Sequence, residues 1–256
     1  MPEGHLLHRL ARDQQELVGH AVTAASPQGR FAAGAAAVDG HRLEAVEAWG
    51  KHLLQRFGAA GTVHTHLGMR GITLRSAPPV LPKPQVRLRL ATGDVAWDLI
   101  APATCVLIDD AGVDRLLAGL GPDPLRADAD IGRVRQALRD DHRAIGTVLL
   151  DQSVLAGVGN VFRAEALHAL GLHPSTPAAD LDDGTVERLW AELVAEMRRG
   201  VEDGAIVTRP PSGKAVYKRD ACADCDTPVV ASALGGRTMY ACPRCQPALT
   251  PSGRTG

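Results

Sequence analysis

Apolar residues follow two different spacings along the chain, one typical of strands and the other of helices. Between residues 21 and 108, short runs alternate apolar and polar side chains, with glycine, proline and serine between them. The strands expected from this pattern are residues 52–57, 62–67, 86–90 and 95–100. Several antiparallel strands at this spacing predict a β-sandwich. One helix precedes them over residues 5–18, where apolar positions fall near one face up to Gly19.

The second half of the chain has helical periodicity. A proline-containing break at residues 120–125 separates it from the strands and is the expected domain boundary. The helices expected are residues 131–139, 144–152, 160–170 and 181–200. Gly157 and Gly159 stand ahead of Asn160, which is suited to N-cap the third of these helices. Such a turn either cradles an anion with its backbone N–H groups or simply connects two helices. The expected fold class is α+β, with an N-terminal antiparallel β-sandwich and a C-terminal helical domain.

Composition changes this picture little. With 45% apolar residues among 256, the chain can bury a sizeable core. It has neither a run of about 18 apolar residues nor a charged N-terminal region followed by an apolar one. We therefore expect no membrane span, no signal peptide and a cytoplasmic location. The net charge of −1 does not indicate nucleic-acid binding, yet residues 198–256 hold nine Lys/Arg against five Asp/Glu. A chain that is neutral overall can still present one basic face.

Four cysteines near the C-terminus give the most specific local signal. Cys222 and Cys225 form one pair, and Cys242 and Cys245 form a second pair after a gap of sixteen residues. Two such pairs are typical of a structural zinc ion held by four thiolates on a small β-ribbon. A cytosolic context argues against disulfides, so we expect one zinc ion per chain. Arg237 stands at the tip of the ribbon, between the two pairs.

The chain begins Met1-Pro2-Glu3-Gly4, which suggests an N-terminal nucleophile. Removal of the initiator methionine would leave Pro2 with a free secondary amine. An α-amino group titrates near about pH 7.7–8.0, so part of it is unprotonated in the cell and can form a Schiff base. Glu3 lies beside it as a candidate acid or base. Many proteins start Met-Pro, and an ordinary processed terminus is the commoner explanation of these residues alone.

Two stretches among the strands carry candidate contacts to a ligand. Lys51 follows Gly50 at the mouth of a strand, a position where lysine is usually just solvated. Residues 64–71 lead a strand into a glycine-flanked turn that bears Met69 and Arg70. Such a turn is usually a hairpin, and it can also be a wedge that enters a duplex.

Three histidines in the same region are a further candidate. His64 and His66 share one face of a strand, and with His52 they could in principle hold a metal ion. No carboxylate or further histidine at a suitable spacing supports such a site.

Three separated motifs now coincide: the Pro2-Glu3-Gly4 start, the turn before Asn160 and the four-cysteine ribbon with Arg237. Together they resemble the formamidopyrimidine-DNA glycosylase/endonuclease VIII family of base-excision repair enzymes. Residues 50–53 look like that family's phosphate-binding lysine segment, residues 149–165 like its helix–two-turn–helix, and residues 236–246 like its zinc finger. The resemblance covers the whole chain in the right order.

The resemblance implies a bifunctional DNA glycosylase and abasic-site lyase acting on damaged DNA. Pro2 would attack the anomeric carbon and form the Schiff base, and Glu3 would protonate the sugar or the leaving group. Lys51 and Arg237 would bind phosphates beside the lesion and assist β/δ-elimination, and Asn160 would hold a backbone phosphate. The further DNA contacts that we expect are His66, Met69 and Arg70.

Departures from the family pattern favour the endonuclease VIII branch, which acts on oxidised pyrimidines. The chain starts Pro-Glu-Gly rather than Pro-Glu-Leu, and residues 201–217 are short where purine-oxidation enzymes of the family have a longer capping loop. Many members have a second glutamate near Leu6, and its absence here puts that role in doubt. The alternatives are an oxidised-purine glycosylase of the same fold and a non-catalytic DNA-binding module that contains zinc.

The resemblance also sets the expected organisation. We expect a catalytic sandwich over residues 1–122, a helix–two-turn–helix domain over 123–215, a zinc finger over 216–250 and a disordered tail over 251–256. We expect a monomer that lies in the cytoplasm with the nucleoid and does not bind membranes.

Overall fold

The computed structural model describes residues 2–78, 80–210 and 213–248. The chain divides into two compact units, Met1–Gly119 and Leu120–Gly256. Met1 and the tail expected at 251–256 lie outside the described residues. Within the described part of the chain, no helix has the length and apolar character needed to cross a membrane.

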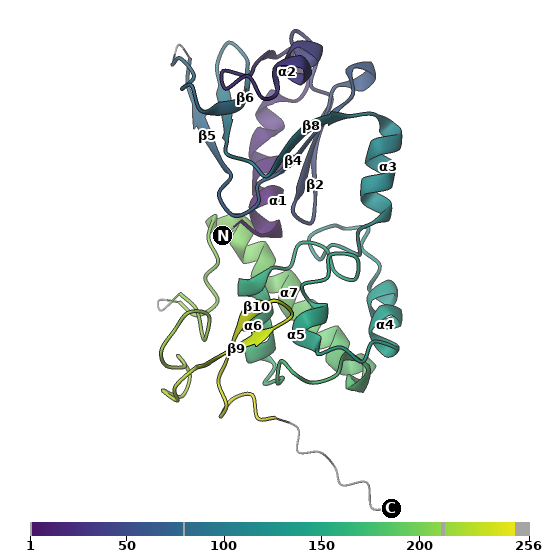
Figure 1. Ribbon diagram of the computed structural model, residues 1–256, viewed down its shortest axis with the longest axis vertical. Coiled ribbons are helices and arrows are strands. Elements are labelled where there is room, and N and C mark those ends of the chain that lie inside the picture. The colour runs from purple at the N-terminus through teal and green to yellow at the C-terminus, as the bar shows by residue number, and fades with distance from the viewer. Residues whose placement is uncertain (1, 79, 211–212, 249–256) are drawn as a thin grey trace, which may run out of the picture. The chain divides into compact units, whose positions relative to one another are not determined.

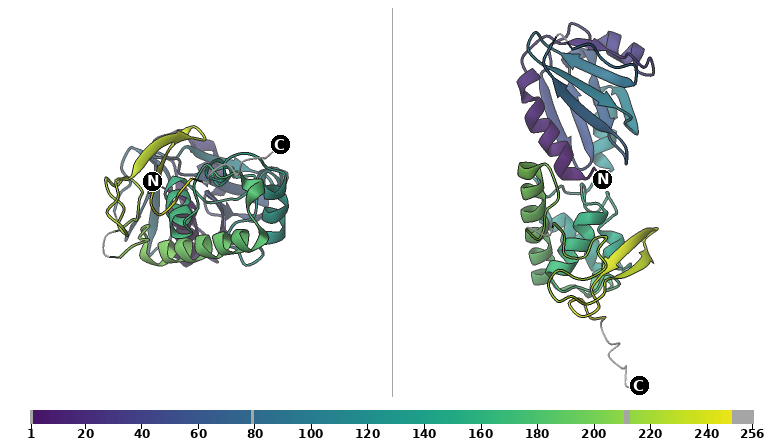
Figure 2. Two further views of the ribbon diagram at one scale, coloured as in Figure 1. Left: turned by 90° about the horizontal axis from the view of Figure 1, so that it is seen from below. Right: turned by 90° about the vertical axis from the view of Figure 1, so that its left-hand side faces the viewer.

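The first unit is a sandwich of two four-stranded antiparallel sheets. One sheet has the order β2-β3-β4-β8, with β2 at Ala45–Trp49, β3 at His52–Arg56, β4 at Thr62–His66 and β8 at Thr104–Ile108. The other has the order β1-β6-β7-β5, with β1 at Thr23–Ala25, β6 at Val86–Ala91, β7 at Ala96–Ile100 and β5 at Ile72–Ser76. The predicted β-sandwich is confirmed, and the two sheets face one another in the right-hand view of Figure 2.

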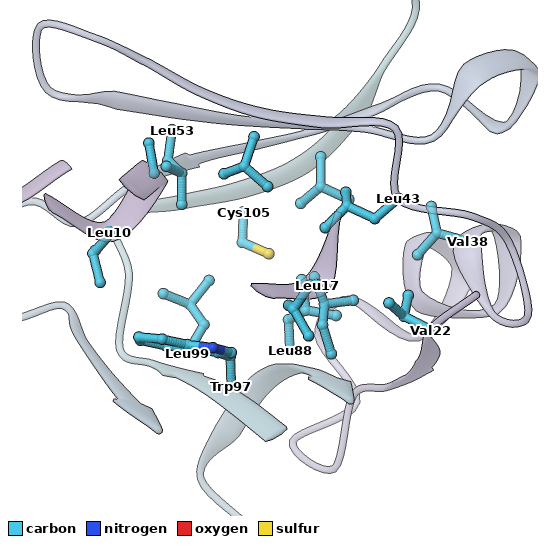
Figure 3. Packing of buried hydrophobic residues seen from close by; sticks show 14 of the residues in the cluster. Leu10, Leu17, Val22, Val38, Leu43, Leu53, Leu88, Trp97, Leu99 and Cys105 are labelled. Atoms are coloured by element: carbon cyan, nitrogen blue, oxygen red, sulfur yellow. The ribbon is translucent and has the colours of Figure 1, made fainter. Parts of the chain in front are cut away.

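One apolar core fills the space between the sheets. Alternate side chains of β3 and β4 point inward from one sheet, and those of β6 and β7 point inward from the other. Figure 3 shows Leu53 and Cys105 from the first sheet opposite Leu88 and Trp97 from the second. Helix α1 (Gly4–Asp13) adds Leu7 and Leu10 to this core, and a 3₁₀ turn, η1 (Gln14–Leu17), continues it to Leu17. The leading helix is therefore confirmed, with its last turn tightened.

Two short helices in this unit were not expected. Helix α2 (Ala32–Val38) consists of alanine, glycine and valine, and it has no polar face to mark its period. Helix α3 (Asp110–Ala118) starts where the Asp109 side chain accepts a bond from the Gly112 backbone, and it buries only Val113. A helix with so narrow a buried stripe leaves a weak hydrophobic pattern in the sequence. A 3₁₀ turn, η2 (Gly58–Ala60), joins β3 to β4.

The second unit is mainly helical. Its helices are α4 (Ile131–Arg139), α5 (Ile145–Val148), α6 (Asn160–Ala169) and α7 (Asp183–Asp203), with a 3₁₀ turn, η3 (Ala178–Asp180). Helix α4 matches the expected bounds, whereas α5 is much shorter than the predicted residues 144–152. The N-cap of α6 is Gly159, so the prediction that Asn160 caps this helix is wrong. Asn160 occupies the first helical position instead.

A two-stranded hairpin completes the second unit. Strands β9 (Val230–Leu234) and β10 (Arg237–Ala241) pair antiparallel, and Gly235 and Gly236 between them both have positive φ, at 61° and 70°. A two-residue turn of this kind requires two left-handed residues, which glycine supplies without strain. The hairpin lies beside α6 in Figure 1. Its Met239 is fully buried in the same apolar cluster as α6 and α7, so hairpin and helices share one core.

Candidate functional site

The N-terminal residues lie at the head of helix α1. Pro2 is half-buried, and Glu3, at only 1% exposure, is the N-cap residue with extended backbone angles. The Glu3 carbonyl accepts the first bond of the helix from the Leu6 backbone at 3.0 Å. The partial positive charge of a helix N-terminus favours a carboxylate at this position. Burial lowers the pKa of the neighbouring His5 to about 4, so this imidazole is neutral at neutral pH.

Helix α1 places Pro2 and Glu3 toward one end of the sandwich. Near the other end of the helix, Gln14 accepts a bond from Gln55 at 2.7 Å, and Gln15 donates to the Val46 carbonyl at 2.9 Å. Val46 and Gln55 are paired across the β2–β3 hairpin, away from its turn. Because α1 packs along this hairpin, its first residues lie toward the turn that joins β2 to β3. Figure 1 shows α1 running beside β2.

Lys51 and His66 are brought together within the first unit. Lys51 ends the tight turn between β2 and β3, where Gly50 has φ 56°. His52 follows it and pairs with His66 across β3 and β4, with ring centroids 5.1 Å apart. Burial lowers the pKa of His66, and the positive charge of Lys51 lowers it further. Lys51 is therefore the cation of this group, and His66 is neutral beside it.

A backbone contact fixes the tautomer of His66. The Gly68 N–H donates to Nδ1 of His66 at 3.0 Å. A ring nitrogen that accepts a hydrogen bond carries no proton, so the proton of the neutral ring lies on Nε2. His66 thus offers an N–H donor on Nε2, which suits contact with a phosphate oxygen.

The other two histidines are hydrogen-bonded to one another and do not form a metal site. Nδ1 of His52 lies 2.8 Å from Nε2 of His64. Burial, together with the charges of neighbouring groups, lowers the pKa of His52 to about 3 and that of His64 to about 4, so both rings are neutral. Among the described residues, the cysteines form the one group whose geometry suits a metal ion. The weak alternative of a histidine metal site is thus not supported.

The turn that bears Met69 and Arg70 connects the two sheets and is not a hairpin. It leaves β4 in one sheet and enters β5 in the other, so the ordinary hairpin interpretation of residues 64–71 is wrong. A β-carbon on Gly71 would lie 2.4 Å from the Leu67 carbonyl oxygen, so the turn tolerates only glycine there. Met69 is 67% exposed. An exposed methionine on so tight a turn suits an apolar wedge.

In the second unit, Asn160 and the β9–β10 hairpin are joined directly. The Asn160 side-chain amide donates to the Thr238 carbonyl at 2.9 Å. Thr238 follows Arg237, which is exposed at the start of β10. The structure therefore brings Asn160 and the backbone of the Arg237 segment together. The side chain of Asn160 is 9% exposed, so much of its bonding capacity serves the hairpin.

Arg163 locks this junction, and the sequence analysis gave it no role. Its guanidinium is fully buried and donates to the Gly146 carbonyl at 2.9 Å and to the Leu234 and Thr238 carbonyls at 3.2 Å each. It also donates to the Asn160 side-chain oxygen. One guanidinium thus links α5, α6 and both strands of the hairpin.

Glu165 fixes the segment that leads into the cysteines, and it too was given no role. Its carboxylate is 1% exposed. It accepts bonds from the Thr208 hydroxyl and from three consecutive backbone N–H groups, those of Ala215 (2.6 Å), Val216 (3.0 Å) and Tyr217 (2.8 Å). The signal in the sequence was two charged residues inside the apolar run of an expected helix, residues 161–167.

The four cysteines form a compact sulfur cluster. Their Sγ atoms lie within 4.8 Å of one another. The separations are 3.5 Å between Cys225 and Cys242, 3.5 Å between Cys225 and Cys245, and 3.9 Å between Cys222 and Cys245. A tetrahedral zinc ion with Zn–S bonds of about 2.3 Å needs sulfur atoms about 3.8 Å apart. The donor set therefore fits a structural zinc ion.

The predicted site residues fall into two groups, one in each unit. Pro2, Glu3, Lys51 and His66 lie at one end of the sandwich, with Met69 and Arg70 on the turn that follows His66. The cysteines, Asn160 and Arg237 belong to the helical unit. The first group holds a carboxylate beside Pro2 and a cation, and the second holds an amide and a cation on neighbouring segments. The roles expected of these residues stay predictions.

Two family models match the chain. The formamidopyrimidine-DNA glycosylase N-terminal domain matches residues 1–98, and the formamidopyrimidine-DNA glycosylase H2TH domain matches residues 120–211. Endonuclease 8 1 of Mycobacterium tuberculosis H37Rv is 39% identical over 267 residues, covering 96% of this chain and all of the relative. Formamidopyrimidine-DNA glycosylase of Thermomicrobium roseum is 31% identical and covers 81% of this chain and 82% of its own.

Solved structures share the fold. Lactococcus lactis Fpg in complex with DNA containing N7-benzyl-Fapy-dG superposes with a TM-score of 0.80 at 22% identity, covering 96% of this chain and 100% of that one. The same enzyme bound to DNA with an abasic site gives a TM-score of 0.79. The chain belongs to the formamidopyrimidine-DNA glycosylase/endonuclease VIII family, whose members are base-excision repair DNA glycosylases with abasic-site lyase activity.

Proposed function

We propose that this enzyme excises oxidised pyrimidines from DNA through a Schiff base on Pro2 and then cleaves the strand by β/δ-elimination. The observation that carries the proposal is the place of Glu3, 1% exposed at the head of α1, directly after Pro2 in a chain of this family. A buried carboxyl beside an amine is the pair that Schiff-base chemistry at a sugar requires.

The residues of the first unit supply the chemistry in sequence. The unprotonated Pro2 nitrogen forms a bond to C1′ as the bond from C1′ to the base breaks, and the base leaves with a proton. The nitrogen then loses its own proton, its electron pair forms the C1′=N bond of the iminium, and the bond from C1′ to O4′ breaks, which opens the sugar ring. Glu3 supplies the proton to the leaving base or to O4′ of the sugar. The resulting iminium makes the C2′ protons acidic. Loss of one C2′ proton breaks the bond to the 3′ phosphate, and a second elimination breaks the bond to the 5′ phosphate. Water then hydrolyses the iminium and restores the amine.

Phosphate contacts position the strand for these steps. We assign Lys51, His66, Asn160 and Arg237 to backbone phosphates, since cations and N–H donors fix register without reading sequence. Met69 and Arg70 fill the space that an extruded nucleotide leaves in the stack. A zinc ion on the four cysteines would hold the hairpin that carries Arg237, and it would take no part in bond breaking.

The preference for pyrimidines is supported by the relatives. Identity to endonuclease 8 1 of M. tuberculosis, 39% with all of that protein covered, exceeds the 31% to formamidopyrimidine-DNA glycosylases. The segment between α7 and Cys222 is also short, and Glu165 holds its last residues firmly. An oxidised-purine glycosylase is the second candidate, favoured by the glycosylases named after formamidopyrimidine among the relatives.

Borohydride trapping on a panel of duplexes tests the proposal. The processed enzyme should form a covalent adduct with duplexes carrying an oxidised pyrimidine and with abasic DNA, and less with duplexes carrying 8-oxoguanine. A matched form with residues added before Pro2 has an amide there. It should bind lesion DNA but neither trap nor cleave, a loss of several orders of magnitude. Equal trapping by the extended form would move the nucleophile to a lysine, with Lys51 the first to test.

Glu3→Gln separates the two activities. It preserves the amine and nearly the volume of the side chain but removes the acid. We expect excision of an intact base to stall while cleavage of a preformed abasic site is less affected. Equal losses on both substrates would contradict the role of Glu3 in base release. A stronger adduct with 8-oxoguanine than with oxidised pyrimidine would select the second candidate.

A further inference from the structure

The C-terminal end of helix α6 packs against the cysteine cluster. His168, one residue from the end of the helix, is 4% exposed, and its Nε2 lies 3.2 Å from Sγ of Cys222. Just beyond the helix, the Leu172 carbonyl accepts a bond from Gln246 at 2.8 Å, and the Gln246 side chain in turn accepts the Cys242 backbone N–H at 3.0 Å. The approach is close, since a β-carbon on Gly171 would lie 3.2 Å from the Cys245 carbonyl oxygen.

We propose that His168 donates a hydrogen bond from Nε2 to the zinc-bound thiolate of Cys222 and is thereby a positioning residue of the zinc site. The inference rests on the proposed zinc ion, and it does not depend on which base the enzyme excises. A thiolate bound to zinc accepts hydrogen bonds and cannot donate one, so the contact requires the proton on Nε2.

The charge of the site explains why a donor is needed there. Four thiolates and one Zn²⁺ leave a net charge of −2, and Cys222 is fully buried. Hydrogen bonds to the sulfur atoms spread this charge, as outer contacts do in other metal sites. Cys225 has the Thr227 hydroxyl at 3.3 Å, and Cys242 has the Cys245 backbone N–H at 3.4 Å. His168 gives Cys222 the corresponding contact from a helix outside the cysteine segment.

The surroundings of His168 keep its Nε2 directed at the sulfur. The other ring nitrogen, Nδ1, lies 3.9 Å from the Asp224 carboxylate, which is beyond hydrogen-bonding distance. Asp224 itself is held by Arg209 through contacts of 3.1 and 3.2 Å. The ring is thus fixed by burial on α6 and by its contact with Cys222.

Zinc release to a coloured chelator tests the proposal on the full-length protein. The variants are His168→Phe, which fills the space without a donor, and His168→Gln, whose amide can replace the Nε2 donor. His142→Phe makes the same ring change at an exposed position of the same unit. We expect His168→Phe to lose zinc about 10–100-fold more readily, the usual effect of removing an outer-shell partner. His168→Gln and His142→Phe should stay close to the parent.

A second measurement detects the hydrogen bond itself. In the cobalt-substituted protein, loss of a donor to a thiolate raises the energy of the sulfur lone pair, so the sulfur-to-cobalt band should move to longer wavelength in His168→Phe and not in His168→Gln. If His168→Phe does not fold, His168→Gln is compared with His168→Asn, whose side chain is too short to reach Sγ of Cys222. Equal zinc release by parent and His168→Phe, or by Gln and Asn, would overturn the proposal. A parent without zinc would overturn it together with the zinc assignment, while borohydride trapping still decides the catalytic proposal.

Discussion

The two units of this enzyme are stabilised in different ways. In the sandwich, the core between the sheets is apolar, and Leu53, Val63 and Leu90 are typical of it at 2% exposure or less. In the helical unit, a single helix buries Arg163, Glu165 and His168, and the neighbouring α7 buries Glu196. Both units have an apolar core, and the second adds buried charged side chains whose hydrogen bonds, unlike apolar packing, depend on direction.

The two kinds of support suit the residues that each unit carries, Pro2 in the sandwich and Arg237 in the helical unit. The proposed nucleophile, Pro2, needs a fixed position, and the closely packed core beneath α1 can provide it. The hairpin that carries Arg237 is largely exposed along β9, with little apolar surface of its own. Its position comes from the buried Met239 and from specific contacts. Asn160 and Arg163 bond to its strands, and Glu165 and His168 hold the segment that leads into it.

The largest expected effect is that of Cys222→Ser on the helical unit alone. Structural zinc supplies about 10–16 kcal/mol in small zinc domains, so its loss should release the hairpin and weaken DNA binding. Hydrogen exchange followed by mass spectrometry should show faster exchange over residues 208–248 and unchanged exchange in β2–β4. Equal zinc content in variant and parent, or faster exchange in both units, would contradict the comparison.

Arg163→Met should have the next largest effect. It leaves the carbonyls of Gly146, Leu234 and Thr238 without their charged donor, at a cost of roughly 3–5 kcal/mol. DNA affinity should fall while zinc content stays at the parent value, because the sulfur cluster lies at the other end of α6. Thermal unfolding and metal analysis on the same sample check this. A normal melting temperature would show that the buried guanidinium does not hold the hairpin.

Leu53→Ala is the matched change in the apolar unit. Leu53 is 2% exposed, and a buried leucine truncated to alanine costs about 3 kcal/mol. Exchange should accelerate across β2–β4 with no change in the hairpin, the reverse of the pattern for Cys222→Ser. Trapping on abasic DNA at low temperature should persist, since Leu53 is no part of the site. A selective loss of trapping in folded protein would show that packing and chemistry are linked more tightly than we infer.

Glu196→Gln should stabilise the enzyme. Glu196 is 3% exposed with neither carboxyl oxygen hydrogen-bonded, and burial, with Glu192 and Glu165 nearby, raises its pKa to about 9. The unfolded chain ionises this group near pH 4.5. As pH rises between those values, the unfolded state loses the proton first and gains stability relative to the folded state. The variant should therefore gain at most about 3 kcal/mol at pH 7, with little gain at pH 4.5. If the gain in unfolding free energy did not depend on pH, the stabilisation would come from packing and not from removal of the carboxyl group.

Arg237→Ala should have the smallest effect on stability, because the side chain is exposed. DNA binding should weaken about equally on all sequences, and the slope of log affinity against log salt should fall by roughly one unit.

Asn160→Ala should leave the slope unchanged, yet loosen the hairpin, because the amide also holds Thr238. A loss confined to one base sequence would contradict the phosphate assignment.

The spacing of apolar residues predicted those strands and helices in which buried positions recur with one regular period. Strand β6 and helix α4 were found with nearly their observed bounds because their apolar positions keep one period throughout. The place of β4 and β5 in different sheets could not be predicted, because no local feature records which sheet a strand joins. The candidate site residues were proposed because their types and spacings are unusual, and their roles stay predictions.

The residues that the sequence analysis missed share one cause. Arg163 and Glu165 are charged, and pattern analysis assigns charged residues to the surface. Most of their partners are backbone groups 50 to 75 residues further along the chain, with Tyr217 and Thr238 as examples. Because every residue has a backbone carbonyl, and every residue except proline a backbone N–H, the type of a partner residue does not reveal such a contact. Asn160 was given the wrong local role for the same reason, since its amide serves β10 and not the helix start.

The large sequence separation of these contacts determines the order in which they can form while the chain is being synthesised. Helix α6 leaves the ribosome long before Cys242 and Cys245 do, at a time when Arg163 and Glu165 have none of the distant partners that will surround them. Contacts between residues this far apart form late, after the local helices. Until those partners emerge, the charges that α6 buries in the folded unit are better left in water. Synthesis of the β9–β10 hairpin would then complete the contacts that bury Arg163, so the interior of the helical unit closes after its helices have formed.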